Sequence, residues 1–140
     1  MNIDDFIRKA VGVPWQSRKS DWSGMDCWGL VIMFYKHVLN IELPFIDGYQ
    51  HVEAEMSSRY VDPELKTNRW IKQNKPSGDN TIFLAYHKGE PCHVGVVIDD
   101  NFVLHTNGNS KHGQVQYNKL EAVARQYQKL EFYKYDNLSQ

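Results

Sequence analysis

Residues 93–105 read HVGVVIDDNFVLH, two runs of β-branched and other apolar residues joined by a polar Asp-Asp-Asn. Such runs around turn-forming residues predict two antiparallel strands connected by a tight turn. Because side chains alternate between the faces of a strand, one face carries His93 and the other carries a continuous apolar row. A hairpin symmetrical about Asp99 sets His93 opposite His105, with Cβ atoms about 4.5–5.5 Å apart. The two imidazoles are therefore predicted to hydrogen-bond.

Further strand-like segments surround this hairpin in the second half of the chain. They are rich in β-branched and aromatic residues and are separated by Gly, Asp and Asn. Together with the hairpin they predict strands at 81–86, 93–98, 102–106, 114–117 and 130–135. A short helix over 120–127 is predicted before the last strand. Since the helical patterns precede the strands, the sequence predicts an α+β fold with N-terminal helices packed on a five- to six-stranded antiparallel sheet.

The first half of the chain carries helical spacing. Apolar positions three and four apart predict a short helix over 3–11, and a wider apolar stripe predicts a stronger helix that begins after Asp26. Residues 15–24 between them are polar and are predicted to form a loop. A third helix is predicted over 62–73. Its buried face would consist of Leu65, Trp70 and Ile71.

The composition is that of one globular domain, and we expect a single domain over residues 1–140. An apolar fraction of 41% and a charged fraction of 24% exclude wholesale disorder. Sixteen basic and seventeen acidic residues give a net charge of −1, and no basic run supports binding to nucleic acid or to a membrane surface. The longest apolar stretch, 27–35, is too short to insert into a bilayer, which needs about 20 residues. The N-terminus lacks the pattern of a cleavable signal peptide.

Cys27 falls in the first turn of the helix predicted after Asp26. The positive end of a helix, together with a nearby imidazolium, can lower the pKa of a thiol to about 3.5–7.5. The first-turn amides have no partner within the helix and can hold an oxyanion. We therefore predict that Cys27 is a nucleophile and that His93 acts as base and then as acid. His105 is predicted to orient His93, and Asn107 is the next candidate for that role.

Cys92, by contrast, is predicted to be a small core residue. It is adjacent to His93 on a strand and therefore points to the opposite, core-facing side. The same alternation disfavours a disulfide to Cys27 and a zinc site, so no metal or other cofactor is expected. Cys27 could likewise be a small buried residue of an apolar helix. Trp28 could belong to the core or to the wall of a cleft.

Residues 24–31, GMDCWGLV, resemble the nucleophile motif of the NlpC-type cell-wall cysteine peptidases, whose common form is Asp-Cys-Ser-Gly-Leu-Val. Residues 93–97, HVGVV, are similar to the His-Val-Gly-Ile-Tyr strand of that family, and His105 stands at the family's third polar position. The GVPW at 12–15 and the GD at 78–79 resemble two further family motifs. The matches follow the family's order over nearly the whole chain.

The resemblance implies a papain-like α+β fold and a cysteine endopeptidase that hydrolyses γ-D-glutamyl–diamino acid bonds in peptidoglycan stem peptides. It also implies Cys27, His93 and His105 as the catalytic residues. The Trp28 that follows the cysteine, together with Tyr35 and Ile41-Glu42-Leu43-Pro44, most resembles the tail-tip assembly peptidases of long-tailed phages. This variant implies phage tail proteins as partners and a protein that is made in the host cytoplasm and acts at the cell wall. The substrate and oxyanion neighbourhood is implied to include Asp26, Trp28 and Trp15.

Two departures from the family pattern leave other functions open. Trp15 stands where the family has a Tyr whose hydroxyl faces the cysteine, and Trp28 replaces a small Ser. An indole N–H can only donate a hydrogen bond and lies elsewhere than a phenol. One alternative is therefore a structural tail assembly protein with little or no activity. Another is a toxin that uses the same Cys–His pair as an amidase on a different amide.

Overall fold

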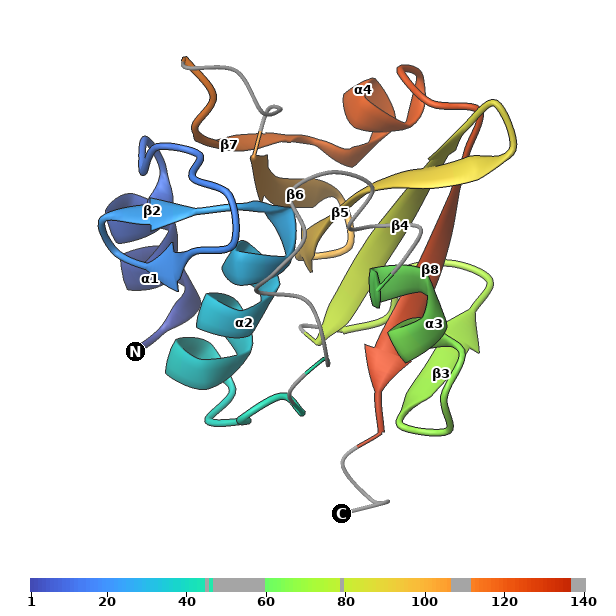
Figure 1. The fold of residues 1–140 in the computed structure, drawn as a ribbon, viewed down its shortest axis with the longest axis horizontal. Coiled ribbons are helices and arrows are strands. Elements are labelled where there is room, and N and C mark those ends of the chain that lie inside the picture. Colours follow the sequence, from blue (N-terminus) through green and yellow to red (C-terminus); the bar gives the residue numbers. More distant parts are fainter. Residues whose placement is uncertain (45, 47–59, 79, 107–111, 137–140) are drawn as a thin grey trace.

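The part of the chain that the structure describes forms four helices and eight strands (Figure 1). The structure is a computed structural model that describes residues 1–44, 46, 60–78, 80–106 and 112–136. The helices are α1 (Ile3–Ala10), α2 (Cys27–Val38), α3 (Asp62–Leu65) and α4 (Leu120–Ala124). The strands are β1 (Ser20–Asp21), β2 (Gly24–Met25), β3 (Trp70–Gln73), β4 (Thr81–His87), β5 (Glu90–Ile98), β6 (Phe102–Thr106), β7 (Val115–Lys119) and β8 (Lys129–Tyr135).

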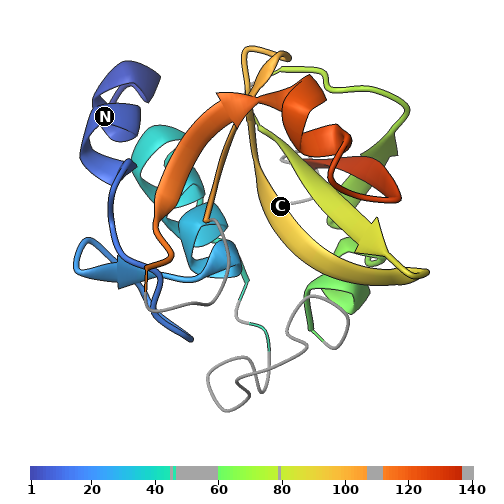
Figure 2. The ribbon, with the colours of Figure 1, turned by 90° about the horizontal axis from the view of Figure 1, so that it is seen from above.

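Six of the strands form one antiparallel sheet in the order β3-β8-β4-β5-β6-β7, which confirms the predicted α+β fold. Helix α2 covers one face of this sheet, with α1 packed against α2, and α4 covers the other face (Figure 2). The main core lies on the α2 side, where Leu30 and Phe34 meet Val94 and Val96. A smaller cluster around Phe83 lies on the α4 side. Burial on both faces explains why the central strands are apolar throughout.

Helix α2 begins after Asp26, as the sequence predicts. Asp26 has an extended backbone, and its Oδ1 accepts a hydrogen bond from the Gly29 N–H at 2.7 Å, the geometry of an N-cap. At the other end, Asn40 adopts a positive φ of 56°, a left-handed conformation that asparagine tolerates better than most residues. With 12 residues α2 is the longest described helix, and no described helix is long and apolar enough to cross a membrane.

The predicted loop over 15–24 contains a short hairpin instead. Strand β1 pairs with β2, so that Ser20 lies opposite Met25. The backbone of this region also bonds to the start of α2, because the Lys19 carbonyl accepts the Asp26 N–H at 3.2 Å. The polar composition of 15–24 does not reveal this hairpin, because strands of two residues are too short to show an alternation of apolar and polar side chains.

The prediction of a helix over 62–73 is wrong for most of these residues. The helix ends at Leu65, and Trp70–Gln73 form the edge strand β3 paired with β8. Ile71, predicted to be buried, is 46% exposed. The buried carboxylate of Glu64 accepts a hydrogen bond from the Trp70 Nε1 at 2.9 Å, which anchors the strand to the short helix. Pairing with a distant strand therefore overrides the local helical spacing.

The hairpin within 93–105 forms, but its register differs from the prediction by two residues. Val96 pairs with Leu104, whereas a hairpin symmetrical about Asp99 would pair it with residue 102. Asp99 and Asp100 have φ values of 52° and 60°, and two successive positive φ values are typical of a type I′ turn. A shift of two residues leaves every side chain on its predicted face.

A carboxylate on β8, Glu131, joins three strands through its side chain, which is 12% exposed. It accepts hydrogen bonds from the hydroxyl of Tyr86 at 2.7 Å, the hydroxyl of Tyr133 at 2.9 Å and the Lys72 ammonium at 3.1 Å. Burial would raise the pKa of Glu131, but these hydrogen bonds and the charge of Lys66 outweigh it and lower the pKa to about 2.

We expect the free energy of unfolding of Glu131→Gln to depend less on pH in acid than that of the wild type. A carboxylate with a lowered folded pKa stabilises the fold above its ordinary value of 4.5 and loses that contribution as the pH falls through about 2. Between these values the free energy of unfolding of the wild type should fall by on the order of 2 kcal/mol more than that of the variant. Urea denaturation at stepped pH measures this. Glu121→Gln, which removes an exposed partner of Arg125, is the control, and identical slopes in all three proteins would contradict the prediction.

Candidate active site

Cys27 is the first residue of α2, and its half-buried side chain packs against the main core. Asp26, the residue before it, is buried and uses both carboxylate oxygens. Oδ1 accepts from the Gly29 N–H and Oδ2 accepts from the Arg18 N–H, each at 2.7 Å. These bonds join the first turn of α2 to the preceding β1–β2 region. Asp26 therefore positions Cys27 through the backbone.

His93 and His105 lie on one face of the sheet, with His93 Nε2 and His105 Nδ1 2.9 Å apart. They are not directly opposite, because the turn sets the register: continuing the β5–β6 pairing puts Gly95 opposite His105. His93 reaches His105 along a diagonal, a distance that long side chains can span. A Cβ at Gly95 would lie 2.6 Å from Phe83 Cε2 and 2.9 Å from His105 Cβ. The glycine thus leaves the space that the diagonal pair occupies.

Both imidazoles are buried, with exposed fractions of 8% for His93 and 5% for His105. Burial lowers the pKa of His93 well below its usual range, and the charge of His105 lowers it further. Burial lowers the pKa of His105 as well, although its hydrogen bond to Asn118 opposes the shift. Both shifts favour the neutral rings, and a neutral His93 can accept a proton.

Cys92 is exposed, which corrects the prediction that it is a core residue. Ala85 pairs with His93 while the next residue, Tyr86, pairs with Pro91, so Cys92 is the extra residue of a β-bulge. Alternation does not continue across a bulge, and the side chain turns outward. Cys27 and Cys92 form no disulfide bond.

Tyr127, which follows α4, lies at the site although the sequence does not assign it there. Its ring stacks on His93, with centroids 5.8 Å apart and an interplanar angle of 17°. Burial raises the pKa of Tyr127, and negative charge on Cys92 and on Cys27 raises it further, so both sulfur atoms lie within electrostatic reach of the phenol. Tyr127 therefore contacts His93 and lies within the electrostatic range of Cys27. In the sequence it is one more apolar position of the helix predicted over 120–127, which is typical of a core residue.

Asn118 on β7 is a second residue that the sequence does not assign to the site. Its Oδ1 lies 2.8 Å from His105 Nε2. The alternation of β7 places Asn118 on the histidine face only once its pairing with Val103 is known. Asn107, the alternative orienting residue, lies outside the described residues.

The two tryptophans predicted near the substrate have different surroundings. Trp28 is 1% exposed and packs against Trp70 at 6.2 Å between ring centroids. It also lines a pocket of about 430 Å³ together with Ile32 and residues 41–44, so it belongs both to the core and to the wall of a cleft. Trp15 is half-buried, and its backbone N–H donates to the Gly113 carbonyl at 2.8 Å, next to the start of β7. A substrate contact of Trp15 remains a prediction.

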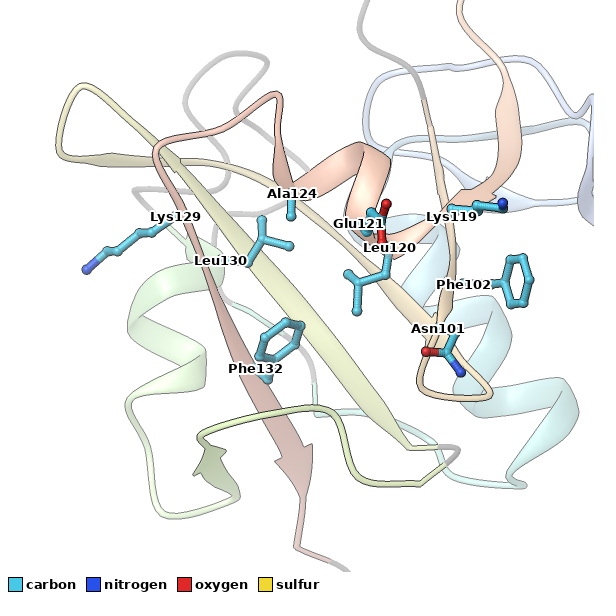
Figure 3. Close-up of a pocket in the computed structure, with 9 residues that line it drawn as sticks. All are labelled: Asn101, Phe102, Lys119, Leu120, Glu121, Ala124, Lys129, Leu130 and Phe132. Atoms are coloured by element: carbon cyan, nitrogen blue, oxygen red, sulfur yellow. The ribbon is translucent and has the colours of Figure 1, made fainter.

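A separate apolar groove of about 500 Å³ lies on the α4 side of the sheet. In Figure 3 the side chains of Leu120, Leu130 and Phe132 converge in it, and Lys129 points outward from its rim. Cys27 and the two histidines do not line this groove. Within the described ranges, no three His, Cys, Asp or Glu side chains are grouped so that they could hold a metal ion.

A helix with a cysteine in its first turn, packed on an antiparallel sheet that carries a buried histidine pair, defines a papain-like α+β protein. The chain belongs to the NlpC/P60 family, whose family model matches residues 12–133.

Two solved structures show the same fold. The chain is similar to the NlpC/p60 domain of peptidoglycan hydrolase SagA, with a TM-score of 0.57, 16% identity and coverage of 96% of each chain. It is also similar to an NlpC/P60 family protein from Bacillus cereus ATCC 10987, with a TM-score of 0.54 and 22% identity. That match covers 84% of this chain and 34% of the Bacillus cereus protein. No curated protein matches the chain.

Proposed function

We propose that the protein is a cysteine endopeptidase that hydrolyses peptidoglycan stem peptides at the γ-D-glutamyl–diamino acid bond. The observation that carries this proposal is the 2.9 Å contact between His93 and His105 on a sheet whose packed helix begins at Cys27. Membership of the NlpC/P60 family supports the reaction class. The similarity to a domain of the peptidoglycan hydrolase SagA supports the substrate class.

The proposed reaction is a two-step acyl transfer. His93 takes the thiol proton, and the Cys27 thiolate attacks the carbonyl carbon of the scissile amide. The first-turn amides of α2 other than that of Gly29, which donates to Asp26, hold the resulting oxyanion. His93 then protonates the leaving amine, so that the C–N bond breaks and a thioester remains on Cys27. Water, deprotonated by His93, hydrolyses the thioester and releases the carboxylic acid and the free thiol.

Digestion of purified sacculi, read by mass spectrometry, tests the substrate. The expected products are stem peptides cut between the D-glutamyl residue and the diamino acid. Cleavage of another amide, with intact muropeptides, would instead favour the amidase toxin. No cleavage of any amide would favour the structural assembly protein.

We further propose that this activity belongs to a phage or prophage tail. The support is in the sequence, where Trp28 follows the cysteine and Ile41-Glu42-Leu43-Pro44 follow α2. Mass spectrometry of purified phage particles tests it: the protein should be present together with tail proteins, and particles that lack it would contradict the assignment.

Iodoacetamide labelling separates an active thiol from a structural one. We expect Cys27 to react at least about 10-fold faster than Cys92 near neutral pH, although Cys92 is the more exposed of the two. Partial burial raises the pKa of the Cys92 thiol, which slows its reaction further. Time-resolved peptide mapping gives both rates, and labelling in urea provides the reference in which the rates should be equal. Faster labelling of Cys92 in the folded protein would favour the structural assembly protein.

A further inference from the structure

We propose that Asn118 is a positioning residue that sets the tautomer of His93 through His105; this inference rests on the proposed function. Three adjacent strands each contribute one side chain to a row of hydrogen bonds: His93 from β5, His105 from β6 and Asn118 from β7. The nitrogen–nitrogen distance between the histidines is 2.9 Å, and the distance from His105 Nε2 to Asn118 Oδ1 is 2.8 Å.

The positions of the ring hydrogens follow from the contact between Asn118 and His105. In the orientation of the Asn118 amide that the structure gives, Oδ1 faces His105 Nε2. Because an amide oxygen can only accept, His105 Nε2 then carries the hydrogen and donates it. A neutral imidazole carries one N–H, so His105 Nδ1 is bare and accepts from His93 Nε2. His93 Nδ1 is then the bare nitrogen of its ring. It is therefore the atom that can accept the proton of a thiol.

This assignment requires that both rings are neutral. The low exposed fractions of His93 and His105 disfavour their charged forms, because burial removes most of the solvation of a charge. With one hydrogen on each ring, the row has two possible directions. In the reverse direction His93 would carry its hydrogen on Nδ1 and could not act as a base. With its amide oxygen toward His105, Asn118 selects the productive direction, whereas its Nδ2 in that place would select the reverse one.

The strand register shows which residue of β7 can reach His105. Gln116 lies directly opposite His105, while Asn118 lies opposite Val103. His105 therefore reaches Asn118 along a diagonal, just as His93 reaches His105. The row of hydrogen bonds therefore crosses the sheet obliquely, and Asn118 is its last member. Gln116 shares the histidine face and lies in the same strand, which makes it a matched control.

Nitrogen-15 NMR of the histidine rings tests the tautomer without any substrate. In the wild type, His93 should show a bare Nδ1 and a protonated Nε2. In Asn118→Leu, which has a similar size and no acceptor, His93 should show a mixture of both tautomers. Gln116→Leu should keep the wild-type ring spectrum. A wild-type His93 that is protonated on Nδ1 would overturn the proposal, and this result needs no variant to fold.

Kinetics on muropeptides test the consequence for the reaction. Asn118→Leu should lower kcat by roughly 10-fold with an unchanged KM, because the loss of orientation affects the base and not substrate binding. Asn118→Asp, which can only accept, should restore the wild-type ring spectrum near pH 9, where the imidazoles are neutral. Wild-type kcat and an unchanged tautomer in Asn118→Leu would overturn the proposal. The expected tautomers without any muropeptide hydrolysis would support the tautomer assignment and contradict the proposed function.

Discussion

Cys27→Ala is expected to abolish muropeptide hydrolysis while leaving the protein folded. The substitution removes the atom that forms the thioester, and no described neighbour offers a second nucleophile in the first turn of α2. We expect kcat to fall at least about 10³-fold. The free energy of unfolding should change by no more than about 1–2 kcal/mol, because the cysteine is small and half-buried. Product release followed by mass spectrometry and a thermal melt give the two quantities.

Cys92→Ala is the matched control for this experiment. It removes the second cysteine of the chain, which is exposed on the β-bulge beside His93. We expect it to keep most of the activity, so that a loss seen only in Cys27→Ala identifies the nucleophile. Undiminished hydrolysis by Cys27→Ala would contradict the peptidase proposal.

Gly29→Ala is expected to destabilise the protein strongly, although it places a better helix former in α2. A Cβ at this position would lie 1.9 Å from the Lys19 carbonyl oxygen and 3.0 Å from Asp26 Oδ1. The Lys19 carbonyl belongs to the backbone and also accepts the Asp26 N–H, so it cannot move without disturbing the N-cap. We expect a loss of about 2–4 kcal/mol, seen as a drop in Tm on the order of 10 °C.

The sign of this effect distinguishes packing from propensity. Helix propensity alone would make alanine about 1 kcal/mol more favourable than glycine. Lys36→Ala, at an exposed position of the same helix, is the control and should melt close to the wild type. An equal or higher Tm for Gly29→Ala would show that the β1–β2 region does not pack against the start of α2 as the structure describes.

The strongest predictions from the sequence are those that depend on local chemistry. Asp26 as an N-cap with an apolar stripe behind it is enough to place the start of α2. Alternation along strands is enough to put His93 and His105 on one face, and this holds even though the register differs by two residues.

The errors arise where a distant partner decides the structure. The apolar spacing of Trp70–Gln73 is compatible with a helix, but the segment pairs with the edge of β8 and forms a strand. The side chain of Cys92 does not follow the alternation between the two faces of β5, because the β4–β5 ladder has an extra residue there. Neither the pairing of β3 with β8 nor the bulge in β5 can be recognised from the few residues that surround it in the sequence.

The sequence by itself determined the start of α2, the strands around the histidines and the face that they share, because caps, turns and alternation act over a few residues. Only the tertiary structure decided that Tyr127 stacks on His93 and that Asn118 ends the row of hydrogen bonds. Those contacts depend on which strands are neighbours and in which register they pair. The free energy that selects them comes from burial of the whole sheet and from no single segment.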